Sequence, residues 1–313
     1  MPFPEGYILR HPELDEAPAV QAIMDAAESA NTGESRRHED DVATEWRNPK
    51  CRPGENWWVA AAPDGFVAAV GWVWPETAGE VTADHYVHPE HRGLGLGETM
   101  LDAIEARAAE LPSTRVDGTP RRLVVWCEDS DVARGASLER RGFVAVRQYF
   151  EMAIDLGGQL AAPAWPAGIV ARGFRLGVDE QAVYQADNEA FAEHHLYQPR
   201  LYDEWRLFHL DAPDGDVSLW QLAWDGDELA GFIIPFAGDR GALIDDLGVR
   251  KAWRSRGIGR ALLLAAFRTL SERGQSVARL MVDAQNVTDA VRVYEAVGMH
   301  IARRFDVLEK SLA

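Results

Sequence analysis

Two stretches of the chain carry nearly the same pattern of basic residues and glycines. One reads VHPEHRGLGLGETML from Val87, and the other reads VRKAWRSRGIGRALL from Val249, 162 residues later. Each leads from an apolar segment through a glycine-rich turn into an amphipathic stretch. The shared positions are Arg92, Gly95 and Gly97 in the first copy and Arg254, Gly257 and Gly259 in the second. A repeat spaced by about half of the 313 residues predicts a structural unit that occurs twice.

The order of predicted elements is also the same in both halves. In each half a strand and a helix precede a hairpin, and a further strand enters the glycine turn. A helix follows the turn, at residues 95–109 or 257–273, with apolar side chains at helical spacing on one face. This order predicts an α/β (α+β) fold with two tandem domains. Each domain is expected to have a mixed, mostly antiparallel central sheet flanked by helices.

The length suits two domains of about 150 residues each. Residues 156–168, LGGQLAAPAWPAG, are rich in glycine, proline and alanine and have no periodicity, so this interval is the expected linker. We therefore predict an N-terminal domain at 1–158 and a C-terminal domain at 166–313.

Composition limits the kinds of partner and the cellular location that we expect. A net charge of −18 argues against a nucleic-acid backbone and favours a cationic small molecule such as an amine, although an acidic surface also simply keeps a protein soluble. No apolar run reaches the roughly 20 residues of a membrane span, and the N-terminus lacks a signal-peptide core. Cys51 and Cys127 form neither a disulfide framework nor a metal site. We expect a cytoplasmic monomer or homodimer.

A strand that ends in a glycine turn before a helix is an anion site, because free amides and the positive end of the helix dipole favour phosphate. Glycines allow positive φ and let a pyrophosphate approach the backbone closely. Arg254, Arg256 and Arg260 add charge to the second copy, whereas the first has only Arg92 nearby. Neither turn has the Gly-Lys-Ser/Thr of a P-loop, and both come too late in the sheet for a dinucleotide fingerprint.

The spacing Arg-x-x-Gly-x-Gly after a valine resembles the motif of the GNAT superfamily of N-acetyltransferases, and the order of elements extends this resemblance over nearly the whole chain. It implies that the turn binds the pyrophosphate of acetyl-CoA or coenzyme A, and that the strand before it splays from its neighbour and pairs with the pantetheine arm. The implied coenzyme-binding residues of the C-terminal half are Leu247, Gly248, Val249, Arg254, Arg256, Gly257, Ile258, Gly259, Arg260, Asn286 and Tyr294. Those of the N-terminal half are His85, Tyr86, Val87, Arg92, Gly93, Leu94, Gly95, Leu96, Gly97 and Glu98.

The resemblance also implies direct attack of an amine on the thioester, without a metal, helped by a base on the central strand and a tyrosine acid on a following helix. Tyr294 is the candidate acid, although it shares a helical face with apolar residues and could be plain core. Asn286 could equally be an N-cap. Asp245 is the candidate base, and the alternative is that it only binds the positive charge of the substrate. Because successive strand residues face opposite ways, we expect only one of Asp245 and Asp246 to face the cleft.

The N-terminal copy lacks these groups. In the repeat alignment Leu138 stands opposite Tyr294 and Ala83 opposite Asp245. We therefore expect the N-terminal domain to be non-catalytic, serving as a scaffold or binding acetyl-CoA, and the C-terminal domain to catalyse. The expected reaction moves an acetyl group from acetyl-CoA to a primary amine of a small molecule in a ternary complex. The alternatives are a protein or peptide N-acetyltransferase and a non-catalytic acetyl-CoA-binding module.

Overall fold

The computed structural model describes residues 3–33, 41–48, 51–75, 80–111, 120–193, 197, 199–211, 215–285 and 290–312. The chain divides into two compact units. Unit 1 comprises residues 1–148 and 305–313, and unit 2 comprises residues 149–304. Among the described residues, no helix combines the length and the apolar character needed to cross a bilayer.

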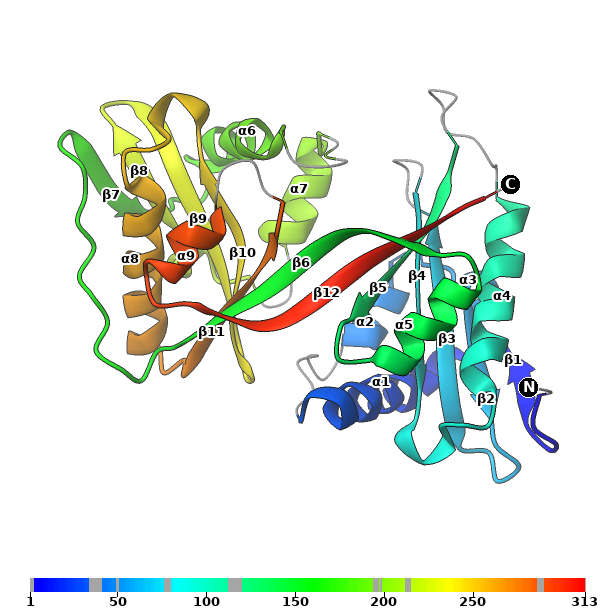
Figure 1. Ribbon diagram of the computed structural model, residues 1–313. Helices are drawn as coiled ribbons and strands as arrows, with labels where there is room; N and C mark the ends of the chain where they lie inside the picture. The colour runs from blue at the N-terminus through cyan, green and yellow to red at the C-terminus, as the bar shows by residue number, and fades with distance from the viewer. Residues whose placement is uncertain are drawn as a thin grey trace. The chain divides into compact units, whose positions relative to one another are not determined.

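Unit 1 is a six-stranded sheet with helices on both faces (Figure 1). Neighbouring strands are antiparallel except for β4 and β5, which pair in parallel from Glu80↔Arg122 to Ala83↔Val125. Its helices are α1 (Ala17–Thr32), α2 (Asp41–Trp46), α3 (Pro53–Asn56), α4 (Leu96–Glu110) and α5 (Val132–Arg140). Its strands, in sheet order, are β1 (Ile8–Arg10), β2 (Trp57–Ala61), β3 (Val67–Pro75), β4 (Glu80–Val87), β5 (Arg122–Glu128) and the end of β12 (His300–Ser311).

Unit 2 repeats this plan. Its strands, in sheet order, are β7 (Ile169–Gly173), β8 (Gln221–Asp225), β9 (Glu228–Gly238), β10 (Gly241–Val249), β11 (Val277–Asp283) and the second part of β6 (Val144–Asp155). Only β10 and β11 pair in parallel. The helices are α6 (Glu180–Phe191), α7 (Tyr202–His209), α8 (Ile258–Glu272) and α9 (Ala290–Glu295).

The continuous burial of β9 over residues 229–235 indicates that helices cover both faces of the second sheet. Ile233 packs with α8 and α9, whereas Phe232 and Ile234 pack with α6 and α7. Helix α8 buries nine of its fifteen residues, among them Leu262, Leu263 and Phe267. These buried side chains confirm the helix predicted at 257–273 and the fold class, because a helix this apolar is stable only when a sheet covers it.

Each unit takes its last strand from the other half of the sequence. Residues 305–311 of β12 pair with β5 in unit 1, and residues 149–155 of β6 pair with β11 in unit 2. The division therefore differs from the predicted domains 1–158 and 166–313. Periodicity reports local structure and carries no information on which distant strand completes a sheet.

The predicted linker also has a different place. Residues 156–168 contain no helix or strand, but they follow the entry of the chain into unit 2. Leu156 is buried in the core of that unit, and its amide donates to the carbonyl of Ser276. Leu160 and Trp165 pack against the same core. The segment is thus part of unit 2 and does not join the two units.

Candidate active site

The turn after β10 has the positive-φ backbone that its glycines predict for an anion site. Gly257 has φ +85° and caps α8, and Ser255 has φ +61°, which is rare for a residue with a side chain. The first turn of α8 leaves amide N–H groups without helical acceptors, and these point out of the helix start. The corresponding turn before α4 also has positive φ at Gly93 and Gly95. Both copies of the repeat therefore have the same local geometry.

Strand β10 separates from β11 just before this turn. The two strands pair only at Ala242↔Ala278 and Leu243↔Arg279, although β10 continues to Val249. From residue 244 onward β10 therefore has backbone groups facing away from β9 that β11 does not use. This is the splayed strand that the resemblance implies.

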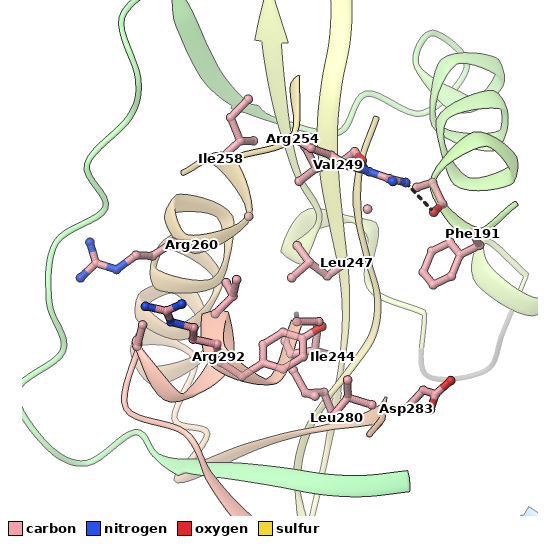
Figure 2. Close-up of a pocket in the computed structure, with 18 of the residues that line it drawn as sticks. Phe191, Ile244, Leu247, Val249, Arg254, Ile258, Arg260, Leu280, Asp283 and Arg292 are labelled. Atoms are coloured by element: carbon pink, nitrogen blue, oxygen red, sulfur yellow. Dashed lines mark hydrogen bonds between the residues drawn. The ribbon is translucent and has the colours of Figure 1, made fainter. Parts of the chain in front are cut away.

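A cavity of about 860 Å³ occupies the fork, all of it within unit 2 (Figure 2). It is bounded by the glycine turn, α8, α9, the end of α6 and the two diverging strands. Its lining is Tyr149, Ala190, Phe191, Ile244, Asp245, Leu247, Gly248, Val249, Trp253, Arg254, Ser255, Gly257, Ile258, Gly259, Arg260, Leu280, Met281, Val282, Asp283, Ala290, Arg292, Val293, Tyr294 and Ala296. Every described residue predicted for the C-terminal site lines it except Arg256, whose guanidinium lies 3.5 Å from Asp225.

The arginines of the turn divide into two kinds. Arg254 is used inside the protein: Nε donates to the carbonyl of Val249 at 3.2 Å, Nη2 donates to the carbonyl of Ala190 at 3.2 Å, and Nη1 pairs with Glu193. It thereby ties the turn to the end of α6. Arg260 lines the cavity and makes no hydrogen bond or ion pair with another described residue. Figure 2 shows Arg260 on α8 and Arg292 on α9 beside the cavity, and Arg254 directed toward α6.

Asp245 lines the cavity at a β-bulge. Ile244 pairs with Pro235 and Asp246 with Ile234, so that Asp245 is the extra residue of β10. Only Asp245 of the two neighbouring aspartates lines the cavity, as expected, but the bulge also brings both to the same histidine: Nε2 of His209 lies 3.5 Å from the nearer Asp245 oxygen and 2.8 Å from that of Asp246. An alternating pattern cannot reveal a bulge.

The surroundings of Asp245 suit a base. Its side chain is 41% exposed, but it lies in a concave wall with many protein atoms around it. This burial, together with the charge of Asp246, raises the pKa of Asp245 to about 6, and the charge of His209 opposes the increase. The carboxylate is therefore ionised at neutral pH and is more basic than an ordinary aspartate.

Tyr294 belongs both to the core and to the cavity. It is 9% exposed, packs within the main cluster of unit 2 and lines the cavity from α9. The structure thus shows a core residue that also reaches the cavity, and the role of Tyr294 as acid stays a prediction. Burial raises the pKa of Tyr294 to about 12, which keeps the phenol protonated and able to donate. Asn286, the remaining candidate, lies outside the described residues.

Three features of the site were not predicted. Arg292 lines the cavity, and His209 and Asp187 surround the aspartates of β10 from α7 and α6. Burial and the charge of Asp246 raise the pKa of Asp187 to about 7. Arg292 stands two residues before Tyr294 on the same helix, so its proximity in sequence to a candidate site residue could have identified it. His209 and Asp187 lie in ordinary helices, so only the tertiary structure reveals them.

The N-terminal copy of the repeat differs from the second copy at the first turn of the helix that follows the glycine turn. Arg92 braces its turn as Arg254 does, donating from Nη2 to Ala27 and Asn31 of α1. However, Glu98 stands where the second copy has Arg260. Its carboxylate accepts from Ser137 and from Nε of Arg141, the latter at 2.8 Å, which ties α5 to the first turn of α4. In unit 1 the gap between these helices is thus bridged by protein side chains.

The strand before the first turn carries side chains that are buried or paired within unit 1. His85 is buried, and its Nδ1 has no hydrogen-bond partner among the described residues. Burial lowers the pKa of His85 well below its ordinary value, so that the imidazole is neutral. Tyr86 donates to Asp84, which also pairs with Arg134 of α5. No acid or base of unit 2 has a counterpart here, as the repeat alignment indicates.

Comparison with known proteins gives the same family for both units. The profile described as "Acetyltransferase (GNAT) family" matches residues 180–299, and that described as "Acetyltransferase (GNAT) domain" matches residues 53–145. The mycothiol acetyltransferase of Saccharopolyspora erythraea is 33% identical over 228 residues, which cover 70% of this chain and 73% of that protein. The mycothiol acetyltransferase of Sanguibacter keddieii is 30% identical over 92% of this chain and 94% of its own length.

Solved structures agree over the whole length. A GCN5-related N-acetyltransferase from Sphaerobacter thermophilus superposes with a TM-score of 0.83 and 30% identity, covering 99% of this chain and 97% of that one. A tandem GNAT protein from the clavulanic acid biosynthesis pathway superposes with a TM-score of 0.73 at 17% identity, covering 98% and 99%, which indicates a shared fold. The chain thus belongs to the GNAT family of acetyltransferases, carries two GNAT domains in tandem, and is an acyltransferase.

Proposed function

We propose that unit 2 transfers the acetyl group of acetyl-CoA to a primary amine of a small molecule, by direct attack within a ternary complex, while unit 1 serves as a non-catalytic scaffold. The observation that carries the proposal is a single cavity that combines the glycine turn, the fork between β10 and β11, Asp245 and Tyr294. A donor bound there would meet an anion site at one end and both candidate catalytic groups at the other.

The residues present fit acetyl-CoA. The turn offers positive-φ backbone at Ser255 and Gly257, and Arg260 is a cation without a described partner, which suits a pyrophosphate. The free edge of β10 offers backbone groups to an amide-containing arm. Leu247, Val249 and Ile258 form an apolar wall between these two features. Acetyl-CoA would supply the activated acetyl group, and the protein would supply orientation and proton transfer.

Two proton transfers follow from the side chains. Asp245 accepts a proton from the substrate ammonium, directly or through a water molecule, which frees the nitrogen lone pair for attack on the thioester carbon. As the carbon–sulfur bond breaks, Tyr294 donates its phenolic proton to the leaving sulfur. The attacking nitrogen loses its second proton to solvent as the amide forms, and the phenolate of Tyr294 is reprotonated from solvent. No covalent enzyme intermediate is needed. The curated relatives are mycothiol acetyltransferases, so a mycothiol-related amine is the first acceptor to test.

Steady-state release of free thiol from acetyl-CoA, measured over a panel of amines, tests the proposal. Double-reciprocal plots of the initial rate should give intersecting lines for a ternary complex. Parallel lines would indicate a covalent intermediate and would contradict the proposal. Tyr294→Phe should lower kcat by about 10²- to 10⁴-fold. The matched control is Tyr7→Phe, which removes a hydroxyl that contacts His91 in unit 1.

Other outcomes would identify the alternatives. Acetylation of lysine peptides in preference to every small amine would make the chain a protein or peptide acetyltransferase. Tight acetyl-CoA binding without thiol release for any acceptor would make it a binding module. Full activity of Tyr294→Phe would remove that residue from the mechanism.

A further inference from the structure

The bulge in β10 brings two neighbouring carboxylates to one buried histidine. His209 of α7 has no exposed surface, and its Nε2 lies 2.8 Å from Asp246 and 3.5 Å from Asp245. Asp245 also lines the cavity, whereas His209 and Asp246 do not. Asp245 is thus the point at which the cavity meets a buried polar cluster behind the strand.

The hydrogen bonds of His209 determine where its protons lie. Nδ1 lies 2.8 Å from the carbonyl oxygen of Trp205, and a carbonyl can only accept, so Nδ1 carries hydrogen. Nε2 faces the carboxylate of Asp246. With both nitrogens facing acceptors, the ring is best satisfied as an imidazolium. Burial opposes this charge, but the hydrogen bond and the negative charge of Asp246 outweigh burial and raise the pKa of His209 above its ordinary value.

A cation in the cluster is favourable because the carboxyl groups of Asp187, Asp245 and Asp246 meet there and repel one another when ionised. Asp187 of α6 is only 5% exposed and makes no hydrogen bond with any described residue. Its oxygen, an Asp246 oxygen and a nitrogen of His209 all lie within 4.8 Å of one another. A divalent metal is one way to balance this charge. It would require Nε2 to be unprotonated, whereas the imidazolium balances the charge with contacts that already exist.

We propose that His209 is a positioning residue for acyl transfer: as a buried cation anchored to Trp205 and Asp246, it holds the bulge of β10 so that Asp245 faces the cavity. This inference rests on the proposed role of Asp245 as base. It assigns a role to α7, which supplies no lining residue to the cavity. The apolar packing of Trp205 against the ring of His209, with centroids 5.2 Å apart, fixes the imidazole in place.

The arrangement has a consequence for pH dependence. The charged groups that face Asp245 are Asp246 on its own strand, His209 of α7, Arg200 in the loop before α7, and Asp187 of α6. His209 and Arg200 favour the ionised form of Asp245, and the two aspartates oppose it. Plotted against pH, the rate should fall on the acid side as Asp245 becomes protonated, and we call this fall the acid limb. Removing the charge of His209 must therefore move the acid limb to higher pH.

The test compares His209→Gln and His209→Phe with the wild type, using thiol release and the best amine of the panel. The glutamine amide can still donate to Asp246 but carries no charge, and phenylalanine does neither. Both variants should raise the apparent pKa of the acid limb on the order of one pH unit, the size of the interaction between unit charges at this distance even in water. His209→Phe should also lower kcat by at least tenfold, with the KM for acetyl-CoA little changed. His300→Gln, at an exposed position, is the matched control.

Two further measurements keep the proposal falsifiable if a variant does not fold. In the wild type, NMR titration of the His209 ring should give an imidazolium at pH 7, and a neutral ring there would overturn the proposal. Dialysis against a chelator should leave the rate unchanged, whereas loss of activity restored by Zn²⁺ or Mn²⁺ would assign the cluster to a metal instead. Lower activity of folded variants with an unmoved acid limb would reduce His209 to a packing role. Full activity of the Asp245→Asn variant would instead contradict the proposed base.

Discussion

Gly248→Ala should lower the stability of unit 2, although the sequence predicts only a coenzyme-binding role for this residue. A Cβ built on Gly248 would lie 2.3 Å from Cε1 and 2.5 Å from Cζ of Phe232, and 3.0 Å from Cβ of Ala190. Phe232 is fully buried, so its ring has no free space to enter. Forcing an extra carbon into a packed core costs about 1–3 kcal/mol. For a domain of this size each kcal/mol lowers the melting temperature by about 2–4 °C.

The same substitution should weaken donor binding. Ala190 would be displaced, and its carbonyl oxygen accepts from Arg254, which braces the glycine turn. We therefore expect a higher KM for acetyl-CoA as well as a lower melting temperature. Gly259→Ala separates the two effects, because its Cβ would only reach ordinary contact at 3.6 Å from Val249. That variant should keep wild-type stability while altering binding at the turn.

Thermal melting followed by circular dichroism, together with chemical denaturation, measures the effect. Gly158→Ala is the control for stability, since no heavy atom lies within 4 Å of its added carbon. Phe232→Leu removes the two ring atoms that clash, so the double variant should be more stable than the sum of the single changes, with a coupling of about 0.5–3 kcal/mol. Wild-type melting of Gly248→Ala, or additive single effects, would refute the reasoning.

Three further predictions concern charge. Because Asp245 has a pKa of about 6 and acts when ionised, kcat/KM should fall as the pH drops through about 6, and an acid limb near 4 in a pH profile would contradict this. Because Glu98 and Arg141 bridge the gap in unit 1, calorimetry should give one acetyl-CoA per chain, whereas two would show that the bridge opens. Asp179, 2% exposed and paired with Arg172, has a pKa held below its ordinary value by that hydrogen bond, so its stabilisation is present at neutral pH and is lost on acidification. Asp179→Asn should therefore cost about 2–3 kcal/mol in urea unfolding at pH 7 and less at pH 3, and an equal cost at both pH values would argue against the ion pair.

Much of the fold followed from local pattern. The helix predicted at 257–273 is α8, because its apolar residues recur at the spacing that buries one face against a sheet. The strand predicted at 243–249 is the end of β10, and the turn between the two has the positive φ values that glycine allows. These features depend on residues a few positions apart, which is the range over which sequence pattern is informative.

The candidate site was predictable only where the chain resembles the family motif. Asp245 and Tyr294 were singled out through that resemblance, and both line the cavity. His209 was not found, because its importance comes from contact with a strand 37 residues away in sequence. The bulge that turns Asp245 and Asp246 toward the same ring is a change of strand register, and a sequence without its pairing partner does not reveal register.

By itself, then, the sequence determined that the chain contains one unit twice, that a strand of each unit ends in a glycine turn suited to an anion, and that only the second turn is accompanied by a candidate acid and a candidate base. The tertiary structure decided which strand segments the two halves exchange and how the surroundings of the two turns differ. It placed residues 149–155 and 305–311 in the sheets of the opposite halves, and it filled the first site with Glu98 and Arg141 while leaving a cavity beside Arg260. The physical reason is that turn geometry arises from local backbone preference, whereas strand partners, bulges and buried charge are settled by the free energy of the whole packed unit.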